Sequence, residues 1–321
     1  MKRMKTISLI LLGVVLAVMI SCAPKEHAET VENASKEDTK TIELVAQEWP
    51  GQEPKRYDMP VNSGLDKLEF GDPANVALDA ADLVLGITLD DLKVAVPLTY
   101  LEGFEVANFS LHDEKYLITW CALVGSAQIF TGNIQGDTLG FDFGRALIDN
   151  NLLMVDRKTR SVWNQLSNEA IHGELKGTKL ELLPTIQTTW GYWKGEYPDT
   201  KVLINKDTTG AIWPSLLFSK PRYTSWKPTD GKFHMADHHQ SDNLGFGLEV
   251  GDSSIYFPFE TLFTEESPIV YSIADQSITV HFNRSGLTAW AEDSAGHMLP
   301  GTLAYNWAWN AFYPKSLIFK N

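Results

Sequence analysis

The sequence lacks most of the residues and motifs on which common enzyme chemistries depend. It has only two cysteines, so modification of either one excludes an internal disulfide. Gly-x-Ser-x-Gly, His-Glu-x-x-His, dinucleotide-binding and Walker motifs are absent, which removes support for hydrolase, zinc-protease and nucleotide-binding functions. Its 27 lysines and arginines are outnumbered by 41 aspartates and glutamates. This acidic balance argues against nucleic acid as a partner and against adsorption on anionic lipid.

The first 21 residues have the pattern of a bacterial secretory signal peptide. Three basic residues precede an apolar run from Ile7 to Ile20, which is shorter than the roughly 20 residues that span a bilayer. The run ends at Ser21-Cys22, which is similar to a lipobox, where the cysteine is acylated and becomes the mature N-terminus. We therefore expect residues 1–21 to be removed and Cys22 to carry the acyl chains, palmitate among them. The protein would then be a cell-envelope lipoprotein that faces the periplasm or the exterior. Its partner would be the membrane, to which this lipid holds it firmly.

The mature chain divides into segments of different composition. Residues 22–57 are rich in charged and small residues and predict a flexible tether. A first β-rich lobe is expected over 58–204, with an inserted segment at 139–182. A connecting stretch, 205–245, leads to a second, shorter lobe at 246–321.

An internal repeat relates the two expected lobes. The run Gly86–Leu98 is echoed by Gly247–Phe259, and both have the pattern of a hairpin. Aromatic residues at constant spacing follow in each copy, namely Trp193 and Tyr197 in the first and Trp309 and Tyr313 in the second. The sequence thus predicts a β-rich α+β fold, made of two related β lobes from an internal duplication, each closed by a short aromatic helix.

The helix of the first copy has recognisable ends. Thr189 can cap its N-terminus, and Trp190, Trp193 and Tyr197 share one face at i, i+3, i+7. Pro198 disfavours helical geometry at Tyr197, so the helix should end there.

Several spaced motifs resemble a known family. They are Thr119–Ala127, Asn151–Thr159, Ser161–Leu166, Ala170–Gly173 and Leu183–Thr200. The chain resembles the bacterial lipoprotein family catalogued as domain of unknown function 3179, some members of which are selenoproteins. The resemblance covers most of residues 83–321 and implies little about activity, because the family itself is uncharacterised.

Two departures from the family pattern bear on chemistry. The family motif reads Cys-Pro-Leu-Cys-Gly, or has selenocysteine at the second cysteine, whereas here Ala122 follows Cys121 and Val124 replaces the second chalcogen. In a second family run, Glu105 and Asn108 are kept, but the histidine and the final aspartate are both phenylalanine. A two-chalcogen redox pair cannot form within this motif, so the redox motif is degenerate.

Cys121 remains the candidate catalytic residue of a single-thiol chemistry. It ends an apolar strand before a turn whose N–H groups can stabilise a thiolate, although most free cysteines are small buried hydrophobes. His281 stands near the matching position of the second copy and is a candidate partner or an ordinary strand histidine. Arg157 can bind a ligand carboxylate bidentately, or belong with Asp156 to a structural hairpin.

The remaining candidates are polar and aromatic. The candidate ligand-binding set for an unknown small molecule is Glu105, Asn108, Ser126, Asp156, Arg157, Trp163 and Trp190. The ten tryptophans can form a ligand-binding face or simply pack in the core. The cluster His234, Asp237, His238, His239 and Asp242 lacks a fixed ligand spacing, so we predict a solvated loop, no metal site and no cofactor.

Three functions compete. The favoured hypothesis is a ligand-binding lipoprotein that keeps its family's architecture and has lost its redox motif. The alternative is a thiol-dependent redox enzyme that uses Cys121, and a third is a scaffold of the envelope. The environment of Cys121 separates them, because a redox enzyme needs an accessible thiolate.

Overall fold

The computed structural model describes residues 66–204 and 244–320, except residues 67, 90–91, 102–103 and 112, and also the backbone of residues 55–56. Cys22, most of the expected tether and the His/Asp cluster at 234–242 lie outside the described residues. Within the part of the chain that is described, no helix has the length and apolar character needed to cross a membrane.

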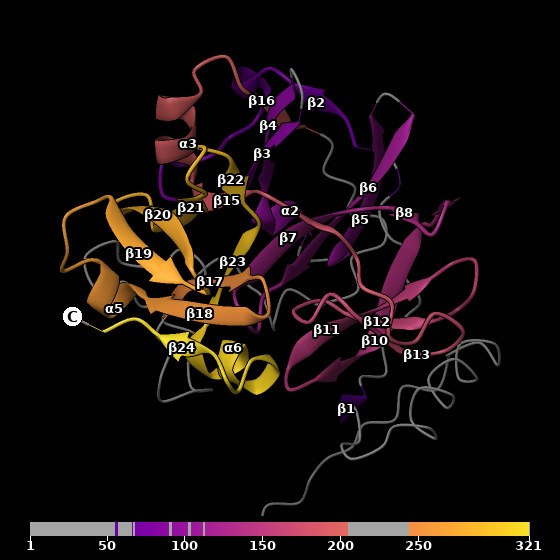
Figure 1. Cartoon of the computed structure of the whole chain (residues 1–321). Helices are drawn as coiled ribbons and strands as arrows, with labels where there is room; N and C mark the ends of the chain where they lie inside the picture. Colours follow the sequence, from indigo (N-terminus) through magenta and orange to yellow (C-terminus); the bar gives the residue numbers. More distant parts are fainter. Residues whose placement is uncertain are drawn as a thin grey trace, which may run out of the picture. The chain divides into compact units, whose positions relative to one another are not determined.

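The described residues are mostly β, with 52% strand and 12% helix (Figure 1). The strands are β1 (Lys55–Arg56), β2 (Phe70–Gly71), β3 (Leu83–Leu89), β4 (Leu92–Pro97), β5 (Val106–Leu111), β6 (Glu114–Cys121), β7 (Ser126–Thr131), β8 (Asn133–Ile134), β9 (Asp137–Thr138), β10 (Phe141–Ile148), β11 (Asn151–Asp156), β12 (Val162–Asn164), β13 (Ala170–His172), β14 (Leu182–Leu183), β15 (Ile186–Thr189), β16 (Lys201–Leu203), β17 (Leu244–Val250), β18 (Ser253–Pro258), β19 (Ile269–Ile273), β20 (Gln276–Asn283), β21 (Thr288–Glu292), β22 (Met298–Leu299), β23 (Gly301–Tyr305) and β24 (Leu317–Ile318). The helices are η1 (Pro73–Asn75), α2 (Leu98–Leu101), α3 (Trp190–Glu196), α5 (Phe259–Leu262) and α6 (Asn306–Phe312).

These strands form five sheets of four or five strands each and one two-stranded ribbon, β8-β9. The arrangement is similar to a five-bladed β-propeller. The predicted α+β class, with two lobes each closed by a helix, is therefore wrong. The described α-helices are only four to seven residues long, so the sheets supply most of the backbone hydrogen bonds.

Two pairs of sheets share the same strand order. One pair is β15-β3-β4-β16 and β23-β17-β18-β24, and the other is β14-β7-β6-β5 and β22-β21-β20-β19. In the first pair the last strand is parallel to its neighbour, as in Val202 beside Ala95 and Ile318 beside Tyr256. The two sheets of this first pair differ at one edge, because β2 adds a fifth, antiparallel strand beyond β16.

The matching aromatic helices pack on matching glycines. A side chain on Gly86 of β3 would overlap the ring of Trp193 in α3, and one on Gly247 of β17 would overlap Trp309 in α6. The predicted helix at Thr189 is confirmed, because Thr189 caps α3 and α3 ends at Glu196 before Tyr197. The aromatic helices thus cover sheet faces whose apolar side chains would otherwise be exposed to water.

A fifth sheet comes from a segment that has no counterpart among residues 244–320. Strands β10 to β13 follow one another along the chain and pair in sequence order, with β1 at the edge of β10. Trp163 of this sheet belongs to the same hydrophobic core as Leu85 and Phe246, so one core serves the inserted sheet and both halves.

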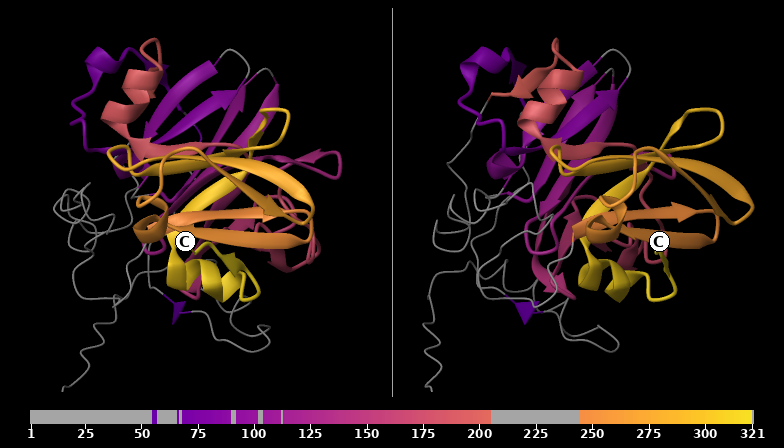
Figure 2. Two further views of the ribbon diagram at one scale, coloured as in Figure 1. Left: turned by 60° about the vertical axis from the view of Figure 1, so that its left-hand side comes forward. Right: turned by 90° about the vertical axis from the view of Figure 1, so that its left-hand side faces the viewer.

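The two halves are also joined by hydrogen bonds. The Tyr305 backbone N–H donates to the Val124 carbonyl, and the Ser126 and Thr302 hydroxyls lie 3.1 Å apart. Figure 2 shows strands of residues 244–320 running beside strands of the first half, in agreement with the contacts of β23 with β7 and of β21 with β15. The two halves are therefore in direct contact at this junction.

Candidate functional site

A buried aspartate organises the turn that carries the candidate site. Asp156 ends β11 and is fully buried. Its Oδ1 accepts hydrogen bonds from the backbone N–H groups of Lys158 (3.1 Å) and Thr159 (2.6 Å). Its Oδ2 accepts from the Thr159 hydroxyl (2.7 Å), the Ser161 N–H (3.0 Å) and the Trp163 indole (3.1 Å). These five donors compensate the burial of the carboxylate and fix the conformation of the turn.

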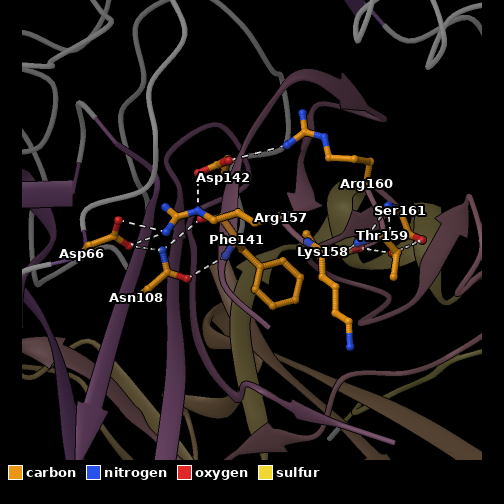
Figure 3. Close-up of polar contacts among 10 residues, drawn as sticks. Asp66, Asn108, Phe141, Asp142, Arg157, Lys158, Thr159, Arg160 and Ser161 are labelled. Atoms are coloured by element: carbon orange, nitrogen blue, oxygen red, sulfur yellow. Dashed lines mark hydrogen bonds and ion pairs between the residues drawn. The ribbon is translucent and has the colours of Figure 1, made fainter. Parts of the chain in front are cut away.

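The turn presents Arg157 to two carboxylates (Figure 3). The Arg157 Nε donates to Asp142 Oδ1 at 2.8 Å, and its Nη1 lies 2.9 Å from both oxygens of Asp66. The Arg157 backbone N–H donates to the carbonyl of Gly140 at 2.9 Å. The Arg157 side chain is 34% exposed and that of Asp66 is 49% exposed, so the contact lies at the surface.

Asn108 of β5 points at the same carboxylate. Its Oδ1 accepts from the Phe141 N–H at 2.8 Å, and its Nδ2 donates to the Phe141 carbonyl at 2.9 Å. The Nδ2 also donates to Asp66 Oδ1 at 3.0 Å. The pairing with the backbone of β10 fixes which terminal atom of the amide is the oxygen and which is the nitrogen. The second N–H of the nitrogen is left directed at Asp66.

The charges around Arg157 favour its cationic form. Burial alone would lower the pKa of Arg157, but the hydrogen bonds that Arg157 donates to Asp66 and Asp142, and the negative charges of these carboxylates, raise it. Arg160 adds a second cation, with its Nη1 3.7 Å from Asp142 Oδ2.

Cys121 lies in a very different environment. The side chain is buried, and its thiol donates to the carbonyl of Asn150 at 3.5 Å. Burial, with a smaller contribution from the charge of Glu105, raises the pKa of Cys121 to about 12, against the weaker lowering effect of nearby backbone N–H groups. The thiol is therefore protonated at neutral pH, and a buried thiol is a poor nucleophile.

His281 makes its contacts elsewhere. Its ring stacks on Trp290 with centroids 5.1 Å apart, and its Nε2 lies 3.3 Å from Glu292. The cross-strand neighbours on β20 and β21 thus account for this histidine, and none of these contacts involves Cys121.

A buried amide network surrounds the position of Ser126. The Gln165 Nε2 donates to the Thr119 hydroxyl at 2.9 Å and to the Ser126 carbonyl at 3.0 Å. Asn151 joins the network through the Gln165 Oε1 at 2.8 Å and accepts from Asn164 at 2.9 Å. These groups hold the inserted sheet to β6 and β7. Its members all lie within the motifs that carry the family resemblance, but the motifs do not show which of these polar groups pair, because that depends on tertiary packing.

An open groove of about 520 Å³ lies between η1 and the end of α3. Lys194, Lys201, Asp72 and Asp199 line it, so its charged groups balance. Trp190 is buried beneath Lys194, whose Nζ lies 5.5 Å from its ring centroid, and does not line the groove.

The predicted ligand-binding residues divide into two groups. Asn108, Asp156, Arg157 and Trp163 meet around the 156–161 turn, either at the surface or as its support. Glu105, Ser126 and Trp190 are buried at other places. Sequence reasoning missed Asp66 and Asp142. Asp142 lies opposite Val155, 15 positions before Arg157, and Asp66 lies 91 positions before it, so neither leaves a local signal beside Arg157.

Metal binding receives no support among the described residues, in which no group of three or more histidine, cysteine, aspartate or glutamate side chains could hold an ion. The predicted solvated loop at 234–242 lies outside them.

Comparison with known proteins gives one match. No curated protein and no solved structure matches the chain. A family model described as protein of unknown function (DUF3179) matches residues 65–295, which include the 156–161 turn, Cys121 and the buried amide network. The family resemblance of the sequence motifs is thereby confirmed, and the chain belongs to the DUF3179 family of proteins of unknown function.

Proposed function

We propose that this protein is a ligand-binding lipoprotein of the bacterial cell envelope, held to a membrane by a lipid on Cys22, with no thiol chemistry of its own. The observation that carries the proposal is the convergence of Arg157 and Asn108 on one exposed carboxylate position. Both donors are fixed by other contacts, which is the condition for binding a small polar ligand at low entropic cost.

The alternative, a redox enzyme that uses Cys121, fits the geometry less well. Turnover needs a thiolate that a substrate can reach, but Cys121 is buried and its pKa is raised to about 12. Val124 supplies no second chalcogen to resolve a mixed intermediate.

The two functions are separated by an alkylation and turnover experiment. We expect iodoacetamide to modify Cys121 at neutral pH only after unfolding in denaturant, with the unfolded chain as the matched control for reagent quality. Peroxide and disulfide reductase assays should show no turnover in the wild type or in Cys121→Ser. Turnover that vanishes in Cys121→Ser would establish the redox alternative.

The membrane attachment is tested on its own. Expression with a labelled fatty acid should label the wild type. Cys22→Ser should remove the label, and should either release the protein from membranes or block removal of the signal peptide. The matched control is Cys121→Ser, which should keep the label and the membrane attachment. A Cys22→Ser variant that stays membrane-bound after its signal peptide has been removed would contradict lipid anchoring.

A further inference from the structure

We propose that Arg157 and Asn108 form a binding site for ligand carboxylates, and that the Asp66 side chain occupies this site as an internal competitor. A ligand carboxylate would take the place of Asp66. This inference rests on the proposed ligand-binding function, and it specifies the chemical class of the ligand and how access to the site is controlled.

The two donors are positioned by groups other than Asp66. Asp142 holds the Nε of Arg157, and the backbone of Phe141 holds both amide atoms of Asn108. Removal of Asp66 leaves each of these contacts in place, so the Arg157 Nη1 and one Asn108 N–H would still point at the same volume (Figure 3). Such a site needs little rearrangement when a ligand arrives.

The Asp66 carboxylate shows which chemistry the site accepts. One of its oxygens receives hydrogen bonds from both Arg157 and Asn108, and the other lies at the same 2.9 Å from the Arg157 Nη1. A planar group with two oxygens and a single negative charge matches these donors.

Asp66 is a suitable competitor because its contact is exposed. Its side chain is 49% exposed, and its side-chain hydrogen bonds to the rest of the described chain are those with Arg157 and Asn108. Exposed ion pairs contribute little free energy, since the charges are screened by water and the side chains lose freedom. An external carboxylate can therefore displace Asp66 without disturbing the buried Asp156 support beneath the turn.

The test is a titration of the full chain in nonionic detergent with sodium acetate, followed by the NMR signal of the acetate methyl group. Sodium chloride at equal ionic strength gives the blank. Because an internal competitor reduces the fraction of open sites, we expect Asp66→Ala to bind acetate about threefold to tenfold more tightly than the wild type. Asp252→Ala, which removes an exposed carboxylate from the β17–β18 turn, is the matched control for net charge and should bind like the wild type.

The donors are tested in the Asp66→Ala background. Arg157→Gln should abolish saturable acetate binding. Asn108→Asp should weaken acetate binding by about tenfold or more. The new carboxylate can still accept from the Phe141 N–H, but its negative charge repels the carboxylate of the ligand. Thermal unfolding of each variant identifies loss of binding that comes from loss of fold.

The outcomes are distinct. Equal affinities in the wild type and Asp66→Ala, with binding still dependent on Arg157, would refute Asp66 as a competitor and keep the binding function. Binding that survives Arg157→Gln, or that is absent from folded Asp66→Ala, would refute the site itself. Tighter binding of inorganic phosphate than of acetate would refute the assigned ligand class.

Discussion

Two glycines at the centre of the fold have tryptophan rings directly above them. Gly86 lies beneath Trp193, and Gly247 lies beneath Trp309. Each ring is buried, so the space for a methyl group can come only from displacement of the helix that carries the tryptophan.

We therefore expect Gly86→Ala to lower the free energy of unfolding by about 1–3 kcal/mol, the usual range for overpacking a core. Gly195→Ala is the matched control, because a side chain there meets no atom within 4 Å and the residue lies inside α3. The control should raise stability by about 0.5–1 kcal/mol through its better helix propensity. Urea unfolding of both variants measures the difference, and equal effects would contradict close contact at Gly86.

The buried Asp156 is the second residue whose replacement has a defined cost. Asp156→Asn keeps the shape but turns one oxygen into an NH₂ group that faces N–H and O–H donors. We expect a loss of about 2–3 kcal/mol, typical of a buried polar group left without an acceptor. Asp149→Asn, a half-buried turn residue with φ +46°, is the control and should change stability little, because asparagine tolerates this conformation. Thermal unfolding measures both, and a neutral Asp156→Asn would show that the turn does not need the carboxylate.

Elements with strong local signals could be predicted from the sequence. Alternating apolar runs gave the hairpins of β3–β4 and β17–β18, and Thr189 with Pro198 gave both ends of α3. Strand β2 could not be predicted in this way, because its two residues pair with β16, more than 130 residues away. The Asp66–Arg157 contact escaped for the same reason.

Each aromatic helix is fastened by an indole hydrogen bond to the segment that follows it. The Trp193 indole donates to the Thr200 hydroxyl at 2.8 Å, and the Trp309 indole donates to the Ser316 hydroxyl at 2.9 Å. This shared feature is independent of the packing on glycine.

Thr200→Val keeps the volume of the side chain and removes the acceptor. We expect a loss of about 1–3 kcal/mol, because the buried Trp193 N–H would remain unpaired. Thr264→Val, whose hydroxyl bonds an exposed turn carbonyl, is the control and should cost less than about 1 kcal/mol. A Thr200→Val variant as stable as the wild type in urea would mean that water replaces the hydroxyl.

At the scale of the whole molecule, the buried thiol couples stability to alkaline pH. The thiol of Cys121 ionises near pH 9 in the unfolded chain but only near 12 in the folded protein. Above pH 9 the unfolded state therefore binds fewer protons than the folded state, and stability falls as pH rises. One group contributes a slope of about 1.4 kcal/mol per pH unit across this window.

Cys121→Ala should flatten the pH dependence of the free energy of unfolding between pH 9 and 10. Above pH 10 the buried Tyr256 and the half-buried Tyr313, whose pKa values are also raised, add slopes of the same sign in both proteins. Urea unfolding across this range measures the effect. Identical slopes in wild type and variant would show that Cys121 is open to water.

The fold class was the part of the sequence prediction that failed, and the reason lies in how the repeats meet. The repeat suggested two related lobes, each closed by a helix, whereas the strands form five sheets in a propeller-like arrangement. One core contains residues from both halves, and the Ser126–Thr302 contact joins β7 to β23. Which polar residues pair across a junction is decided by tertiary packing, which local periodicity does not encode.

That contact joins residues 176 positions apart, which has a consequence for the order of events during synthesis and folding. When β7 leaves the ribosome, most of the chain that will cover it has not yet been made. Contacts of such long sequence separation slow folding, because the entropy of closing the loop is lost before the contact forms. The first half therefore stays incompletely packed until β23 has been synthesised and can contact β7. The proposed export requires the chain to cross a membrane before it folds. Slow folding would keep the chain unfolded, and so able to pass through the membrane, until its last strands have been made.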